Sequence, residues 1–337
     1  MPLEISRRRL IAGAGAALAA AQAPRALLAQ PGSRRGPGQG AFAPDRELRV
    51  PVEGGRIYVR VNGDLNARRP PVLMIHGGPG SAHANFLNAL PLADERAVIL
   101  YDQLDSGRSD SPNDPANWRV PRFVAEVEAI RRALGVSRWH VLGGSWGGTI
   151  ALEYGARRPA GLASVVLQSP LVSTRSWLAD ANALRRQLPG ETQRMLTACE
   201  GRRPPPAAQC EAATDVFNAR FLRRVPLRPE QQAYRAALPP FNSRIYEAMW
   251  GKTEFVSTGT LRNYNGEPLL ARLDASRLLW VTGQHDEARP STVHGFSVRT
   301  PGSSFAVIED AAHGIFNDNP ESFIALLRRW FRRHDAA

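Results

Sequence analysis

The chain has 337 residues, of which 43% are hydrophobic and 22% are charged, and its formal net charge is +12. A chain of this length and composition can bury a substantial core, as globular proteins do. The positive charge comes from arginines spread along the sequence, with Lys252 as the only lysine. Because these arginines form no basic block, we expect no nucleic-acid partner.

The N-terminus has the pattern of a targeting segment. A twin-arginine motif, Ser6-Arg7-Arg8-Arg9-Leu10-Ile11, precedes a small-residue apolar run that ends at Ala21. This run is too short to span a bilayer, so we expect no stable membrane insertion. The pattern predicts a signal peptide over residues 1–29 and export by the twin-arginine machinery to the periplasm or the medium. The alternative is the basic N-terminus of a cytoplasmic protein.

Residues 30–45 are rich in Gly, Pro and Arg, which predicts a linker. In residues 46–170, predicted strands alternate with predicted helices. This alternation predicts an α/β fold with a mostly parallel, doubly wound sheet. An antiparallel hairpin begins it, and an amphipathic helix precedes the fifth strand. The expected strands are 48–52, 56–61, 71–75, 97–101, 139–142 and 163–167.

The strand pattern stops in residues 171–257, which contain helical pieces separated by prolines. We therefore expect a helical cap inserted into the sheet domain, whose second part is residues 258–337. Strands return at 277–281 and 304–308, and an amphipathic helix over 321–333 closes the chain.

The fifth strand leads directly into Gly143-Gly144-Ser145-Trp146-Gly147, and a helical pattern follows it. Gly-x-Ser-x-Gly between a strand and a helix is the nucleophile elbow of the α/β-hydrolase fold. Such a serine is held in a strained backbone conformation, and the flanking glycines avoid collisions with neighbouring elements. Ser145 is therefore the candidate nucleophile. An ordinary serine in a glycine-rich turn is the alternative.

A serine nucleophile needs a base and an orienting acid, which follow it in this order: serine, acid, histidine. Asp286 follows the strand at 277–281, and His313 follows the strand at 304–308. The carboxyl ends of parallel strands meet at one edge of a sheet, where such sites are built. The candidate triad is therefore Ser145, Asp286 and His313. The rivals are Glu287 and Asp274 for the acid, and His285 and His76 for the base.

An oxyanion hole should accompany the triad, because the tetrahedral intermediate carries a negative charge. The expected donors are the backbone N–H groups of Trp146 and Gly78. The two cysteines, Cys199 and Cys210, lie close together in the cap, and an exported protein can join such a pair in a disulfide. Free thiols are the alternative.

Three motifs together resemble the prolyl iminopeptidase family of α/β-hydrolases, over residues 46–333. They are His76-Gly77-Gly78-Pro79-Gly80, then Asp102-Gln103 with Ser106-Gly107-Arg108-Ser109, then Gly143-Gly144-Ser145-Trp146-Gly147-Gly148. The resemblance implies release of an N-terminal proline or another residue from short peptides with a free N-terminus, without a metal or cofactor. It also implies that the loop containing Gly77 contacts the substrate.

The segment from Tyr246 to Phe255 is similar to the part of the family in which a glutamate binds the substrate's amino group. The resemblance makes Glu254 the candidate, with Glu247 and the cap acids Asp215 and Glu211 as possible second carboxylates. The chain departs from the family at Leu104-Asp105, where Arg-Gly is common. Leucine there also occurs in the branch resembling tricorn-interacting aminopeptidases, and aspartate tolerates the positive φ that a glycine would supply.

Two other functions remain compatible with these residues. An amino-acid amidase or a carboxylesterase would use the same scaffold and the same triad. A third hypothesis is a binding module on an inactive hydrolase scaffold. The presence of serine, acid and histidine in the expected order disfavours it. A cap carboxylate that binds an amine would favour the aminopeptidase.

Overall fold

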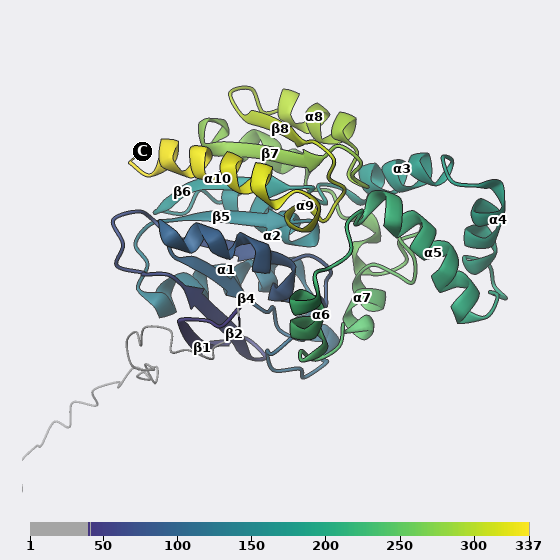
Figure 1. Ribbon diagram of the computed structural model, residues 1–337, viewed down its shortest axis with the longest axis horizontal. Helices are drawn as coiled ribbons and strands as arrows, with labels where there is room; N and C mark the ends of the chain where they lie inside the picture. The colour runs from purple at the N-terminus through teal and green to yellow at the C-terminus, as the bar shows by residue number, and fades with distance from the viewer. Residues whose placement is uncertain (1–39, 41, 337) are drawn as a thin grey trace, which may run out of the picture.

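A computed structural model describes residue 40 and residues 42–336, so the predicted signal peptide lies outside the described residues. Within them, eight strands form one sheet in the order β1-β2-β4-β3-β5-β6-β7-β8 (Figure 1). The strands are β1 (Arg46–Val52), β2 (Gly55–Asn62), β3 (Val72–Ile75), β4 (Val98–Tyr101), β5 (Trp139–Gly144), β6 (Leu162–Gln168), β7 (Leu278–Gly283) and β8 (Ser304–Ile308).

The sheet is antiparallel at one edge and parallel elsewhere. β1 pairs with β2, and β2 with β4, in antiparallel register, so the predicted hairpin is confirmed. From β4 through β3, β5, β6 and β7 to β8 every pairing is parallel. Strands β3, β4, β5 and β7 are buried along their whole length, which explains their largely apolar sequences. The predicted mostly parallel, doubly wound sheet is confirmed.

Helices cover both faces of the sheet (Figure 1). One face packs against α1 (Val120–Leu134), α2 (Trp146–Ala156) and α8 (Pro290–Val298). The other packs against the 3₁₀ segment η1 (His83–Asp94), α9 (Ile315–Asp318) and α10 (Pro320–His334). Short 3₁₀ turns complete the body: η2 (Pro115–Asn117), η3 (Thr260–Asn263), η4 (Glu267–Arg272) and η5 (Ala275–Arg277).

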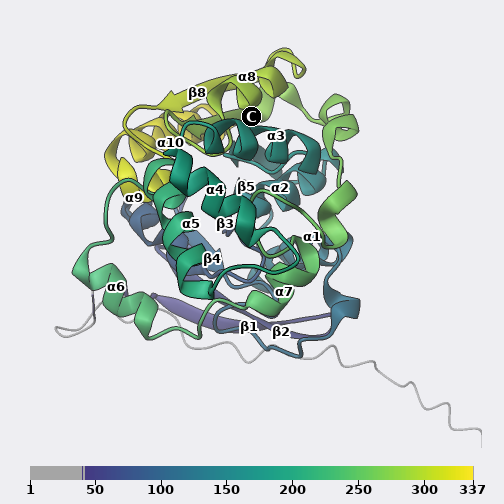
Figure 2. The same ribbon diagram turned by 90° about the vertical axis from the view of Figure 1, so that its right-hand side faces the viewer.

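Five helices lie in the chain between β6 and β7. They are α3 (Thr174–Arg185), α4 (Gly190–Cys199), α5 (Ala207–Phe221), α6 (Pro229–Ala236) and α7 (Ser243–Met249). Figure 2 shows α4 and α5 in front of the strands, on the side that faces the viewer. A disulfide joins Cys199 to Cys210 and so links the end of α4 to α5. We refer to α3–α7 as the cap.

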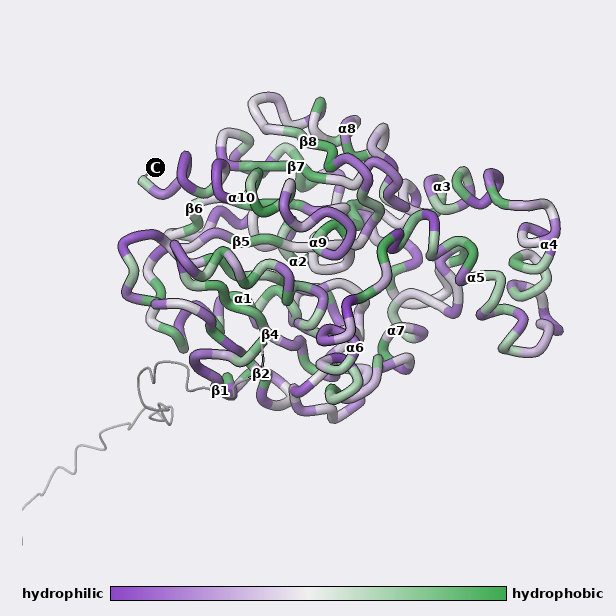
Figure 3. Tube along the Cα trace, in the orientation of Figure 1, coloured by the Kyte–Doolittle hydropathy of each residue, from purple (hydrophilic) through white to green (hydrophobic). Residues whose placement is uncertain are grey.

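Hydropathy follows this arrangement (Figure 3). The strand β7 is almost uniformly hydrophobic, whereas α10 alternates between hydrophobic and hydrophilic residues. The apolar side of α10 buries Phe323, Leu327 and Phe331 against the sheet. In the described part of the chain, no helix combines the length and the apolar character needed to cross a membrane.

Candidate active site

Ser145 lies at the turn between β5 and α2, with φ 57° and ψ −122°. This strained conformation requires close packing of the backbone on both sides. A Cβ on Gly143 would lie 2.1 Å from the carbonyl oxygen of Gly147, and a Cβ on Gly147 would lie 2.0 Å from that of Ile75. Both glycines are therefore required by sterics, because any side chain would force the strand and helix apart.

The loop after β3 lies directly against the serine. A Cβ on Gly77 would lie 3.0 Å from the Ser145 Cβ and 3.5 Å from its Oγ, so a side chain at this position would crowd the serine. Gly78 has φ 111°, which turns the backbone sharply beside the nucleophile. Trp146 is the first residue of α2, where backbone N–H groups are free of helical partners. The sequence-predicted oxyanion donors, Gly78 and Trp146, thus lie on the two segments that border Ser145.

His76 fixes this loop rather than acting as a base. Its Nε2 accepts a hydrogen bond from the Gln103 backbone N–H at 3.0 Å, and its Nδ1 bonds the Gly77 carbonyl at 2.8 Å. Complete burial lowers the pKa of His76, which keeps the ring neutral. The Gln103 side chain receives the Trp146 Nε1–H at 2.8 Å and donates to the His76 carbonyl at 2.8 Å. These bonds connect the Gly77 loop to the elbow.

Asp286 is fully buried and oriented by four donors. Its Oδ2 accepts from the Ser169 hydroxyl at 2.5 Å and from the Gly283 N–H at 3.0 Å. Its Oδ1 accepts from the Ala288 N–H at 2.9 Å and bonds His313 Nδ1 at 2.8 Å. The carboxylate therefore fixes the tautomer of His313 and leaves Nε2 free for proton transfer. Asp274, by contrast, caps η5 at the opposite end of β7.

Glu287, considered above only as a rival for the acid, lies in the site itself. Its Oε1 is 3.6 Å from His313 Nε2, and the residue is 4% exposed. Burial raises the pKa of Glu287, and the nearby Glu254 and Asp286 raise it further against the effect of His313. Burial opposes protonation of His313, but the charges of Asp286 and Glu287 outweigh it and raise the pKa of that histidine.

Glu254 also faces this cavity, held by two cap side chains. Its Oε1 accepts from the Tyr246 hydroxyl, and its Oε2 accepts from Trp177 Nε1 at 3.3 Å. The Trp177 ring meets the His313 ring edge-on, with centroids 5.7 Å apart. The carboxylate is thus positioned near the base.

The other cap acids lie elsewhere. Glu247, Asp215 and Glu211 are exposed and do not line the cavity around Ser145, so the structure does not bring them to the site. The carboxylate that accompanies Glu254 is Glu287. It contributes from the strand-to-helix loop of the sheet domain rather than from the cap.

The second sequence motif is structural. Asp102 accepts from His83 Nδ1 at 2.8 Å and from the Arg108 N–H at 2.8 Å, and a Cβ on Gly107 would lie 2.4 Å from its carboxyl carbon. Asp105 has φ 62° and accepts from Trp118 Nε1 at 2.8 Å. The aspartate therefore tolerates the positive φ and adds a buried hydrogen bond.

A cavity of about 650 Å³ joins these groups between the sheet and the cap. Ser145, His313, Glu254 and Glu287 line it together with Gly77, Gly78 and Trp146. Its apolar lining includes Phe86, Leu171, Trp177, Phe241, Tyr246 and Trp250. Among the described residues, no cluster of His, Cys, Asp and Glu has the geometry to hold a metal ion.

Known proteins match this sequence over most of the chain. The family model of the alpha/beta hydrolase fold matches residues 70–320. The proline iminopeptidase of Heyndrickxia coagulans is 37% identical over 283 residues, which cover 82% of this chain and 96% of that protein. The chain belongs to the proline iminopeptidase family of α/β-hydrolases.

Solved structures also resemble this chain over most of its length. The proline iminopeptidase of Mycobacterium smegmatis is 34% identical with a TM-score of 0.77, and the match covers 86% of this chain and 99% of that one. The crystal structure of VinJ is 31% identical with a TM-score of 0.80, and the match covers 87% and 100%.

Proposed function

We propose that the protein is a serine aminopeptidase that releases proline or another residue from the free N-terminus of short peptides. The observation that carries this proposal is the pair of carboxylates, Glu254 and Glu287, in the cavity of Ser145. A protonated amine is the complement of two carboxylates in one cavity, and both carboxylates raise the pKa of His313. The family of the relatives, whose printed names are proline iminopeptidase, supports the same activity.

The mechanism follows from the arrangement of the triad. Ser145 Oγ attacks the carbonyl carbon of the first residue, while His313 Nε2 takes the hydroxyl proton. The Gly78 and Trp146 N–H groups stabilise the oxyanion, each by about 3 kcal/mol. His313 then returns the proton to the leaving nitrogen, and an ester to Ser145 remains. Water hydrolyses this ester by the same proton transfers in reverse, and the free amino acid leaves.

The two glutamates determine which peptide bond is cleaved. Binding the ammonium of the first residue places the first carbonyl at Ser145, because one residue spans only about 3.5 Å. A peptide with a blocked amine would leave the buried Glu287 and the half-buried Glu254 without a positively charged ligand, which is costly. The enzyme therefore acts as an exopeptidase.

An amino-acid amidase is the second candidate, since it would use the same amine site and the same triad. A carboxylesterase would use the triad alone, and it leaves Glu254 and Glu287 without a role. The three activities differ in the leaving group that the enzyme accepts and in whether the substrate needs a free amine.

The deciding experiment is hydrolysis of proline, alanine and leucine arylamides, each with a free and a blocked amine, beside a short-chain nitrophenyl ester. We expect turnover of the free-amine arylamides, little turnover of the blocked ones, and none in Ser145→Ala or His313→Ala. Ester cleavage without arylamide turnover would establish the esterase instead. Full turnover in either folded variant would refute the triad.

We further propose that the chain is exported by the twin-arginine machinery and works in the periplasm or outside the cell. The twin-arginine motif at Ser6–Ile11 and the apolar run after it support this proposal. The disulfide between Cys199 and Cys210 is compatible with it, because such bonds persist in oxidising compartments.

A further inference from the structure

The cavity around Ser145 contains two guanidinium groups for which the mechanism above has no use. Arg235, on α6, and Arg223, just after α5, both line it. They lie in the same cavity as Glu254 and Glu287, so the site carries charges of both signs.

Arg235 has no counter-charge within the described residues. Its Nη2 donates to two neutral oxygens, the Asn85 Oδ1 at 2.7 Å and the Ala84 carbonyl at 3.4 Å. Its Nε is buried and has no hydrogen-bond partner in this part of the chain. Burial and then the adjacent Arg223 lower the pKa of Arg235 to about 10. A half-buried guanidinium group without a carboxylate partner is suited to an anion that arrives with the substrate.

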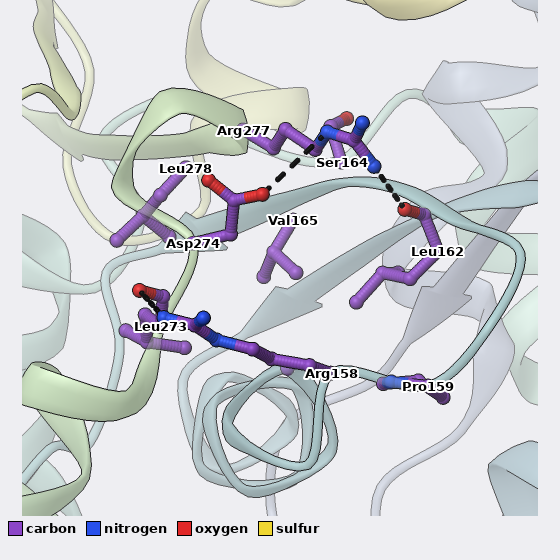
Figure 4. A pocket seen from close by; sticks show the side chains of 10 residues that line it. Arg158, Pro159, Leu162, Ser164, Val165, Leu273, Asp274, Arg277 and Leu278 are labelled. Carbon is purple, nitrogen blue, oxygen red and sulfur yellow. Dashed lines mark hydrogen bonds and ion pairs between the residues drawn. The ribbon is translucent and has the colours of Figure 1, made fainter. Parts of the chain in front are cut away.

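The arginines of a second cavity provide a comparison. This cavity, of about 100 Å³, lies at the amino ends of β6 and β7 (Figure 4). There Arg158 donates to the carbonyls of Arg272 at 2.7 Å and Leu273 at 3.0 Å, and Arg277 lies 3.6 Å from Asp274. Arg277 thus has a carboxylate as its counter-charge, whereas Arg158, like Arg235, donates to neutral oxygens.

Arg235 is held in place by the anchoring of α6. The hydroxyl of the preceding Tyr234 accepts from Arg60 Nη1 and bonds His83 Nε2, both at 2.8 Å. The Asn85 amide that contacts Arg235 also donates to the Ser81 hydroxyl at 3.0 Å. Ser81 directly follows the glycine loop of the oxyanion hole, so the guanidinium is fixed relative to the reaction centre.

Arg223 borders the other catalytic loop. The Gly314 N–H, next to His313, donates to the Leu222 carbonyl at 2.7 Å, and a Cβ on Gly314 would lie 3.8 Å from the Arg223 Cβ. The charges that act on the pKa of Glu287 are those of His313, Glu254 and Asp286, whereas Arg223 acts on Arg235. Arg223 is therefore close both to Arg235 and to the loop that contains His313.

We infer that Arg223 and Arg235 bind the C-terminal carboxylate of the substrate, so that the enzyme selects peptides of two to four residues held at both ends. This inference rests on the proposed aminopeptidase function. Such peptides extend about 7–14 Å from amine to carboxylate. A cavity of about 650 Å³ is of the size that encloses small ligands. Longer peptides would carry their carboxylate beyond the arginines.

The test compares each peptide with its C-terminal amide. Pro-Ala, Pro-Ala-Ala and Pro-Ala-Ala-Ala are assayed as acids and as amides with the wild type, Arg235→Gln, Arg223→Gln and Lys252→Gln. Lys252 is the matched control, because it lines the same cavity but is exposed and two residues from Glu254. The readout is the ratio of kcat/KM for acid over amide, in which any loss common to all substrates cancels.

We expect the wild type to favour the acid at least tenfold for one of these lengths, which is the effect of a charge-assisted hydrogen bond. The ratio should fall towards one in Arg235→Gln and in Arg223→Gln and persist in Lys252→Gln. A wild-type ratio near one, a ratio kept in both arginine variants, or a ratio lost only in Lys252→Gln would each overturn the inference. Wild-type turnover of a proline arylamide shows separately that the aminopeptidase function itself holds.

Discussion

Glu287 and His313 are close enough to influence each other's protonation, with 3.6 Å between Oε1 and Nε2. The atom that must accept the Ser145 proton is therefore the one that the glutamate contacts. Asp286 and Glu287 raise the pKa of His313 in spite of burial, so more of the free enzyme carries the protonated, inactive base. A bound ammonium group offsets the glutamate charge and frees the histidine. The two groups titrate together, and the acid limb of activity belongs to the pair.

We predict that Glu287→Gln moves the acid limb of kcat/KM for a simple nitrophenyl ester to lower pH. The carboxylate raises the pKa of His313, so its removal lowers that pKa, and the base becomes available at lower pH. A charge at this distance accounts for about one pH unit or more. The measurement is a pH–rate profile of both enzymes on an ester that has no amine. An unchanged or upward-shifted limb would show that Glu287 does not act on the base.

A second residue-scale prediction concerns selection of the amine. Glu254→Gln should lower kcat/KM for a free-amine arylamide tenfold or more, since a hydrogen bond to a charged group is lost. Hydrolysis of the simple ester should fall much less. Glu247→Gln is the matched control, because this glutamate is exposed on the same segment and lies outside the cavity lining. Equal losses on arylamide and ester in Glu254→Gln would remove Glu254 from the amine site.

The sequence indicated the elbow and the order of the triad because those features depend on local pattern. It did not indicate Glu287 as a cavity residue, although this residue adjoins Asp286. Its orientation depends on a contact distant in sequence, between its own N–H and the Phe221 carbonyl at 3.2 Å. Glu247 is exposed for a simpler reason. Successive helical residues differ by about 100° in direction, and Tyr246 already points towards Glu254.

At the scale of elements, the buried strands could be predicted because each is a short apolar run between turns. The strands β3 and β4 begin one residue later than expected, a small difference at their ends. The segment η1 and the helix α9 were not predicted. The first contains a proline and the second has four residues, so neither has a helical period long enough to recognise. The placement of α6 depends on the long-range bonds of Tyr234 to Arg60 and His83.

We predict that replacing both Cys199 and Cys210 with serine loosens the cap before it affects the sheet domain. The disulfide closes a short loop with a sequence separation of 11, and a loop of this size contributes about 2–3 kcal/mol. The cap has a separate small core that includes Leu196, Phe217 and Phe255. Because α5 also lines the substrate cavity, KM should rise more than kcat falls.

The measurements for the cysteine pair are urea unfolding and limited proteolysis, with KM from the arylamide assay. Wild type treated with a reducing agent serves as the control and should behave like the double variant. Identical proteolysis of oxidised and reduced protein would show that the bond does not stabilise the cap.

At the scale of the whole molecule, the site is divided between two parts of the chain. The sheet domain supplies Ser145, Asp286, His313 and Glu287, and the cap region supplies Glu254 and the arginines of the cavity. Substrate selection therefore depends on how the cap packs on the sheet, and the cap is also where the disulfide lies. The oxidation state of the two cysteines depends on the compartment in which the protein resides. The proposed export therefore bears on how well the cap side of the cavity is ordered.

This link makes export testable through the cysteines. We predict that wild-type protein is found in the periplasm or medium with Cys199 and Cys210 oxidised. Lysine at both Arg7 and Arg8 should retain the chain in the cytoplasm, where thiols stay reduced. Cell fractionation with thiol alkylation measures both properties in one sample. The matched control replaces Arg34 and Arg35 with lysine, a pair outside the motif, and should be exported normally. Equal export of the two double variants would mean that the twin-arginine motif does not direct this protein.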